Sequence, residues 1–143
     1  MTFMFNVTII CFGNIKEKYY RDALAEYEKR LSGYCRLNII ELRDGTDALP
    51  LLPKRACRIA LCVEGRQLSS EELADYIEKR SLSYSDFCFV IGGFDGLDER
   101  VKQACDMRLS FSKMTFPHRL MRVILLEQLY RAFDIIAGGN YHK

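Results

Sequence analysis

The residues of this chain best suited to chemistry lie in its last third, residues 87–143. An apolar run there ends in a Gly-Gly pair at residues 92–93, and a polar segment with aromatic and thioether side chains follows at residues 109–118. The chain closes with a tail of tyrosine, histidine and lysine at residues 141–143. Glycine allows a ligand to approach the backbone closely, and histidine exchanges protons near neutral pH. These features predict a backbone-lined pocket combined with a polar tail.

The glycine-rich turn reads Gly-Gly-Phe-Asp-Gly at residues 92–96 and follows an apolar strand. That places it at the carboxyl edge of a sheet, where open α/β folds bind ligands. The turn does not match G-x-G-x-x-G, and the chain contains no G-x-x-x-x-G-K-[ST], so neither a dinucleotide nor a triphosphate site is indicated. A ligand that has an adenine but no phosphates would fit; a plain glycine turn is the alternative.

The segment at residues 109–118 lies between an expected strand and an expected helix, and Met114 and Phe116 could form apolar walls of a pocket. His118 and His142 are the only histidines. Neither has a second histidine or a cysteine at metal-ligand spacing, so we expect no metal site. Serine or cysteine triads are not excluded, but no nucleophile-elbow motif supports one.

The composition is that of an ordinary globular chain of 143 residues, 49% hydrophobic and 28% charged, which suffices for one domain with a buried core. No run of about 18 apolar residues is present and the N-terminus lacks signal-peptide features, so we expect a cytoplasmic protein without a membrane span. The six cysteines form no C-x-x-C pair and are expected to be buried thiols.

The net charge of +2 is small, but it is unevenly distributed. From Phe111 onward, five Lys and Arg residues stand against two acidic residues. Positive charge therefore lies beside the candidate site, as an anionic partner requires. Arg119 and Arg122 are three residues apart and share a helix face; either a solvated surface or a phosphate contact fits them.

Apolar runs alternate with helical segments, which predicts an α/β domain with a mostly parallel sheet. We find no linker or internal repeat, so one domain covers residues 1–143. The expected strands are 5–12, 37–42, 58–63, 86–91 and 108–111. The expected helices are 16–31, a helix capped by Ser69 that runs to about residue 80, 98–104 and 117–136.

Three boundaries carry specific expectations. Glu64 and Gly65 are expected to end the third strand, and the segment at residues 44–53 is expected to be a loop with at most one helical turn. Pro117 is expected to be the first residue of the last helix. That helix is apolar around most of its circumference, so the fold or a partner subunit must cover it.

Four segments together resemble one known family: Phe-Val-Ile-Gly-Gly at 89–93, Leu-Ser-Phe-Ser-Lys-Met-Thr-Phe-Pro-His at 109–118, Leu-Glu-Gln-Leu-Tyr-Arg-Ala-Phe at 126–133 and the final Tyr-His-Lys. They are similar to the RlmH family of SPOUT-class methyltransferases, which methylate N3 of a pseudouridine in 23S ribosomal RNA. The likeness extends over essentially the whole chain.

The resemblance implies a SPOUT-type parallel sheet with helices on both faces and a C-terminal trefoil knot. It also implies a homodimer packed through the last helix, with the C-terminal tail near the partner's cofactor. The cofactor would be S-adenosylmethionine (S-adenosyl-L-methionine). Its expected contacts are Leu61, Gly92, Phe111, Ser112, Lys113, Met114, Thr115 and Phe116.

In such a reaction a ring nitrogen attacks the sulfonium methyl, so proximity and alignment supply most of the catalysis. The nitrogen still carries a proton, and we expect His142 to accept it or, alternatively, to hydrogen-bond the RNA. Arg119, Tyr141 and Lys143 are the expected substrate contacts. Because the net charge is small, we expect a structured substrate within the ribosome. A SPOUT methyltransferase for another RNA and a cofactor-free ribosome-binding module are the competing interpretations.

Overall fold

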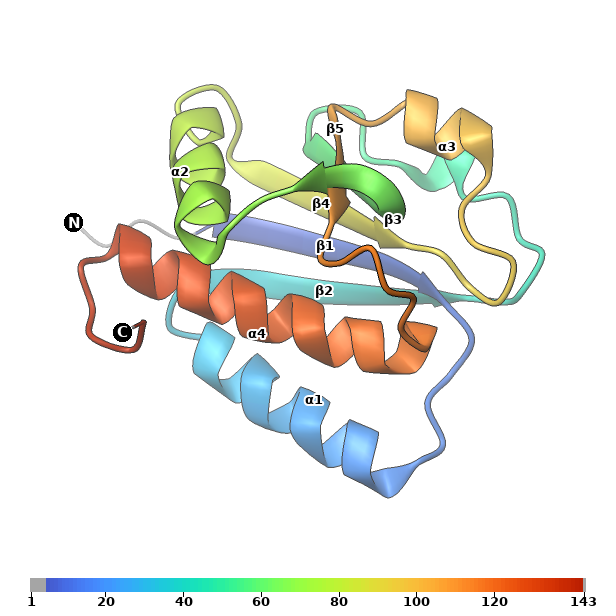
Figure 1. Cartoon of the computed structure of the whole chain (residues 1–143), viewed down its shortest axis with the longest axis horizontal. Helices are drawn as coiled ribbons and strands as arrows, with labels where there is room; N and C mark the ends of the chain where they lie inside the picture. Colours follow the sequence, from blue (N-terminus) through green and yellow to red (C-terminus); the bar gives the residue numbers. More distant parts are fainter. Residues whose placement is uncertain (1–4, 143) are drawn as a thin grey trace.

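A five-stranded parallel sheet forms the centre of the fold in this computed structural model, which describes residues 5–142 (Figure 1). The strand order is β2-β1-β4-β3-β5. The strands are β1 (Phe5–Phe12), β2 (Cys35–Leu42), β3 (Cys57–Gln67), β4 (Asp86–Ile91) and β5 (Met107–Ser110). Because every pairing is parallel, all strands end at the same edge of the sheet. The expected parallel α/β architecture is confirmed.

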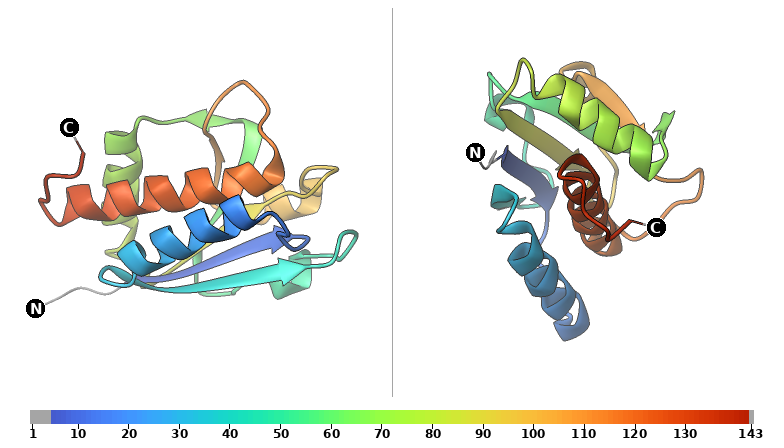
Figure 2. Two further views of the ribbon diagram at one scale, coloured as in Figure 1. Left: turned by 90° about the horizontal axis from the view of Figure 1, so that it is seen from below. Right: turned by 90° about the vertical axis from the view of Figure 1, so that its left-hand side faces the viewer.

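Helices cover both faces of this sheet (Figures 1 and 2). Three helices form the thicker layer: α1 (Lys18–Leu31), α2 (Ser70–Arg80) and α4 (His118–Ile136). The short α3 (Glu99–Gln103) and a 3₁₀ turn, η1 (Leu49–Leu51), lie on the other side. Helix α4 contacts both α1 and α2, and Figure 1 shows it running between them across the sheet.

The two layers follow from the alternation of side chains along the strands. Ile9 of β1 and Phe89 of β4 belong to the larger core, which includes the buried face of α4. Their neighbours Ile10 and Val90 belong to the smaller core, with Val101 of α3. Burial on both faces thus explains why the central strands β1 and β4 are mostly apolar.

Strand β3 departs from expectation, because it does not end at Glu64 and Gly65 but continues to Gln67. Leu109 of β5 pairs with both Leu61 and Arg66, so the residues between them bulge out of register. A Cβ atom on Gly65 would lie 2.7 Å from the backbone carbon of Arg108. The glycine therefore allows β5 to approach β3 closely, and it marks a bulge within the strand where the sequence suggested its end.

The ends of the helices largely match the sequence signals. Ser69 and Glu72 form the expected capping box at the start of α2, with both reciprocal hydrogen bonds present. Pro117 was expected to be the first residue of α4, but it is the N-cap, and the helix begins one residue later at His118. Among the described residues, no helix is both long and apolar enough to cross a membrane.

Candidate functional site

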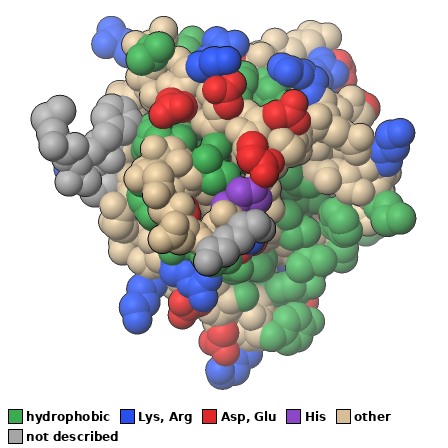
Figure 3. Space-filling view, turned by 60° about the vertical axis from the view of Figure 1, so that its left-hand side comes forward, with side chains coloured by type: hydrophobic (Ala, Val, Ile, Leu, Met, Phe, Trp, Pro, Cys, Tyr) green, Lys and Arg blue, Asp and Glu red, His purple; other side chains and the backbone are tan. Residues whose placement is uncertain are grey.

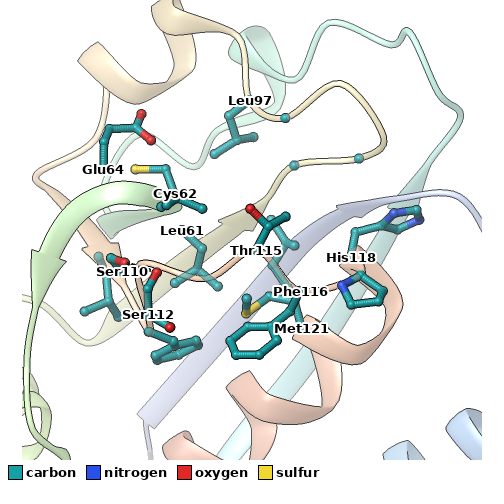
Figure 4. A pocket seen from close by; sticks show the side chains of 18 of the residues that line it. Leu61, Cys62, Glu64, Leu97, Ser110, Ser112, Thr115, Phe116, His118 and Met121 are labelled. Atoms are coloured by element: carbon teal, nitrogen blue, oxygen red, sulfur yellow. Dashed lines mark hydrogen bonds between the residues drawn. The ribbon is translucent and has the colours of Figure 1, made fainter.

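A cavity of about 450 Å³ opens at the carboxyl ends of β3, β4 and β5 (Figure 4). Three segments distant in sequence form most of its wall: the end of β3, the glycine turn after β4, and the connection from β5 to α4. The first turn of α4 and Lys102 of α3 complete it. A parallel sheet brings these segments together because its strands end at one edge.

The glycine turn is held in a narrow loop that leaves its backbone available to a ligand. The amide of Gly96 donates a hydrogen bond to the carbonyl of Gly93 at 3.0 Å, and Gly96 has a φ of 77°. A Cβ atom on Gly92 would lie 2.6 Å from the carbonyl carbon of Gly96, so no other residue fits there without moving the turn.

The connection from β5 to α4 is shaped by its own serines. The buried Ser110 donates its hydroxyl to the carbonyl of Ser112 at 2.8 Å. The hydroxyl of Ser112 accepts from the amide of Met114 at 2.9 Å. These local bonds fold residues 110–114 into a turn. These bonds give this part of the cavity wall its shape.

An ion pair lies at the β3 end of the cavity. Lys102 Nζ is 2.5 Å from Glu64 Oε1, and this hydrogen bond lowers the pKa of Glu64 and raises that of Lys102. Burial raises the pKa of the neighbouring Cys62 thiol. Within residues 5–142, Lys102 is the only Lys or Arg that lines the cavity, and its charge is neutralised by Glu64.

His118 lies on the first turn of α4, and Figure 4 shows it at the opposite end of the cavity from Glu64 and Cys62. Its ring nitrogens have no hydrogen-bond partner among residues 5–142, and the side chain is half-buried. Burial lowers the pKa of this imidazole, and the charges of Arg119 and Arg122 lower it further. His118 is therefore a neutral, unpartnered imidazole at neutral pH.

Arg122 has a structural role, which corrects the expectation of a surface or phosphate-binding side chain. It is 3% exposed and pairs with Glu41 of β2 at 2.5 Å. Its other terminal nitrogen donates to the carbonyls of Phe12 and Gly13 at the end of β1. Arg122 thus ties α4 to the carboxyl end of the sheet through both of its terminal nitrogens, while its buried Nε has no hydrogen-bond partner among the described residues.

Tyr141 and His142 follow the C-terminal end of α4, whereas the cavity lies at the first turn of this helix. At 1.5 Å per residue, a helix of 19 residues is about 28 Å long. The tail folds back on its own chain: Asp134 accepts a hydrogen bond from the amide of Tyr141 at 2.9 Å, and Glu127 accepts one from its hydroxyl at 2.5 Å. Tyr141 is therefore anchored to α4 of its own chain.

Both ring nitrogens of His142 are engaged in this arrangement. Nε2 lies 2.5 Å from Glu71 of α2, and Nδ1 lies 2.9 Å from Arg131 of α4. Arginine can only donate, so Nδ1 accepts and the ring proton is on Nε2, directed at the carboxylate. On the face that carries this end of α4, a histidine lies beside acidic side chains (Figure 3).

The structure brings most of the expected cofactor residues together. Seven of the expected positions line the one cavity: Leu61, Gly92, Phe111, Ser112, Met114, Thr115 and Phe116. Lys113 is exposed and does not line it. Arg119 follows His118 and lies 3.8 Å from Glu17, whereas Tyr141 and His142 are remote within the same chain. Lys143 lies outside the described residues.

Sequence reasoning missed several lining residues, chiefly Cys62, Glu64, Lys102 and His118. Glu64 follows an apolar run and could have been suspected from that position. Lys102 had no such signal, because its approach to Glu64 depends on how α3 packs beside β3.

Comparison with known proteins identifies the family of this fold and site. Residues 5–142 match the family described as predicted SPOUT methyltransferase. The chain belongs to the SPOUT methyltransferase family. Within that class it belongs with RlmH: it is 48% identical to the ribosomal RNA large subunit methyltransferase H of Clostridium novyi, over 96% of this chain and 99% of that protein. The resemblance noted in the sequence is confirmed.

Other relatives of the same name agree. The Bacillus pumilus protein is 45% identical and the Bifidobacterium animalis protein 48% identical, each over 96% of this chain and 99% of its own length. These alignments extend over 158 positions, more than the 143 residues of this chain, so the relatives carry residues without a counterpart here.

Solved structures show the same fold at low sequence identity. A probable methylase family protein from Haemophilus influenzae matches with a TM-score of 0.61 at 12% identity, over 96% of this chain and 70% of that one. A probable methyltransferase from Bordetella pertussis matches with a TM-score of 0.56 at 12% identity, over 92% of this chain and 95% of that one. The α/β fold of this chain is thus shared with both of these structures.

Proposed function

We propose that this protein methylates N3 of a pseudouridine in 23S ribosomal RNA, with S-adenosylmethionine as methyl donor. The observation that carries the proposal is the convergence of Leu61, Gly92 and most of the 111–116 segment on one cavity. The curated relatives named ribosomal RNA large subunit methyltransferase H supply the substrate class. A ribosomal substrate would place the protein in the cytoplasm.

The chemistry of the cavity fits this methyl donor. Its volume of about 450 Å³ falls within the range of small-molecule pockets. The only cation that lines it among the described residues, Lys102, is neutralised by Glu64, which disfavours a ligand with several phosphates. Exposed backbone at the glycine turn can read the edge of an adenine, and Phe111, Met114 and Phe116 provide apolar contacts. When bound, the donor supplies an activated methyl group on a sulfonium.

A second copy of the chain would complete the site. No residue of α4 is fully exposed within one chain. The apolar side chains of Leu120, Ile124 and Ile135 are nevertheless only half-buried. Figure 3 shows hydrophobic side chains gathered toward the lower right of the face in view. We infer that two copies pack through this helix in opposite directions, so that the tail of each approaches the other's cavity.

In that assembly Arg119, Tyr141 and Lys143 would contact the RNA. Its own chain holds His142 far from its own cavity, so His142 would accept the ring proton only at the cavity of the partner chain. The other histidine able to accept this proton is His118, which lines the cavity of its own chain. We also infer that residues 1–143 form one domain with a trefoil knot. The close passage of β5 against the bulge of β3 supports threading of the 111–117 connection.

The first experiment is methyl transfer to ribosomal RNA. Large subunits from a strain that lacks the protein are incubated with labelled S-adenosylmethionine, with and without the protein, and the labelled nucleotide is mapped. A single methyl on N3 of a pseudouridine supports the proposal. Label confined to another RNA favours the competing SPOUT enzyme. A protein that binds neither S-adenosylmethionine nor S-adenosylhomocysteine by calorimetry would instead be a ribosome-binding module.

Complementation tests whether two chains share a site. Gly92→Ala impairs the cavity and His142→Ala impairs the tail, so each homodimer should be defective. Mixing the two after unfolding and refolding should restore activity, because the mixed dimer joins an intact cavity to an intact tail. No recovery in mixed dimers of proven composition would show that the tail does not act across the interface.

A further inference from the structure

We propose that His118, rather than His142, accepts the proton of the target ring nitrogen. The inference rests on the proposed function and assigns one step of it. Methylation at a ring N–H requires the nitrogen to lose its proton, and a positioned side chain is the usual acceptor. The acceptor must lie in the cavity, be unprotonated, and have a free ring or carboxylate atom.

In the part of the chain that the structure describes, four titratable side chains line the cavity, and three are unsuited to accept the proton. Lys102 and Glu64 bind each other at 2.5 Å, which keeps the amine protonated and makes the carboxylate a weaker base. The Cys62 thiol is kept protonated by burial. His118 remains, with ring nitrogens that no described residue engages.

The surroundings of His118 favour its neutral form. Arg119 and Arg122 face it from its own helix, and the helix N-terminus adds further positive potential. Asp44, from the connection after β2, and Glu17, before α1, oppose them with a smaller effect. Burial is the largest influence and disfavours charge. The imidazole is therefore available as an acceptor throughout the neutral range.

His142 is less suited, even if a second copy brings it near. Its Nδ1 accepts from Arg131 and its Nε2 donates to Glu71. It would have to give up at least one of these bonds before it could take a proton. Its observed contacts suit a positioning residue that fixes the tail.

Proton transfer to His118 accompanies the transfer of the methyl group. The N–H bond of the base breaks, the proton moves to a ring nitrogen of His118, and the electron pair stays on the base nitrogen. That pair forms the new nitrogen–methyl bond, while the pair of the carbon–sulfur bond remains on sulfur. His118 then returns the proton to solvent, which the half-buried position of the ring permits.

The test compares His118→Gln with His142→Gln, because glutamine preserves polarity and approximate size but cannot act as a base. Single-turnover methyl transfer to large subunits is measured between about pH 5 and 9. Wild type should lose rate below the pKa of His118, which lies beneath its ordinary value of 6.5, and level off above it. His118→Gln should fall by about a hundredfold or more at pH 7. Its rate should then rise continuously with pH, since only the ionised base reacts.

Two further readouts do not depend on turnover. S-adenosylhomocysteine should bind His118→Gln as tightly as wild type in calorimetry. The His118 ring in the free protein should titrate below pH 6.5 by NMR.

Several results would overturn the inference. They are an unchanged rate and pH profile in His118→Gln, a loss of binding that accounts for its defect, titration at or above pH 6.5, or the predicted profile appearing in His142→Gln. If wild type itself transfers no methyl to ribosomal RNA, the proposed function fails and this inference with it.

Discussion

Replacing Gly92 with alanine should weaken binding of the methyl donor while leaving the protein folded. The added Cβ would lie 2.6 Å from the carbonyl carbon of Gly96 and 2.8 Å from the amide nitrogen of Leu97. Both are backbone atoms, so no side-chain rotation can relieve the contact. The turn must move by about 0.8 Å to reach an ordinary carbon contact distance, and such overpacking costs about 1–3 kcal/mol.

Because the displaced turn is a wall of the cavity, much of this free energy should appear in binding. A loss of about 1–3 kcal/mol corresponds to a dissociation constant raised about 5- to 150-fold. The assay is calorimetry with S-adenosylhomocysteine, with thermal unfolding of the free protein measured alongside. Each kcal/mol of lost stability lowers the Tm by roughly 2–4 °C.

Gly33→Ala is the matched control, since no atom lies within 4 Å of the position of its added Cβ. It should change neither the dissociation constant nor the Tm. If Gly92→Ala binds like wild type, the close contact does not constrain the ligand site and the reasoning is refuted.

Three further predictions concern other parts of the structure. Arg122→Met should lower the free energy of unfolding in urea by about 2–3 kcal/mol, because Glu41 and two backbone carbonyls lose their donor; unchanged stability would contradict the role assigned to it. Asp134→Ala should speed amide exchange in the C-terminal tail while costing about 1–2 kcal/mol or less in stability, and equal exchange rates would show that this carboxylate does not anchor the tail. In alkylation at alkaline pH, S-adenosylhomocysteine should protect Cys62 but not Cys105, which lies outside the cavity; equal protection of both would argue against this cavity as the binding site.

The sequence predicted the layered fold well where a local signal specified an element. The apolar runs of β1 and β4 matched the strands to the residue, and Ser69 with Glu72 marked the start of α2. It failed at Gly65, where a glycine that usually ends a strand instead lets another strand approach. Turn and cap signals depend on neighbouring residues, whereas a bulge depends on the strand packed against it.

The residues of the candidate site also fall into those that local sequence predicted and those that only packing between elements placed. By itself, the sequence determined the family of the chain and most of the wall of the cavity, because glycines and short polar segments after strands must meet at one edge of a parallel sheet. Only the tertiary structure decided the burial, the partners and the positions of the charged and titratable side chains. It buried Arg122 against Glu41, paired Lys102 with Glu64, held His142 away from the cavity and left His118 free at its rim. Charge acts through space, so these roles depend on distances between elements that the order of residues along the chain does not contain.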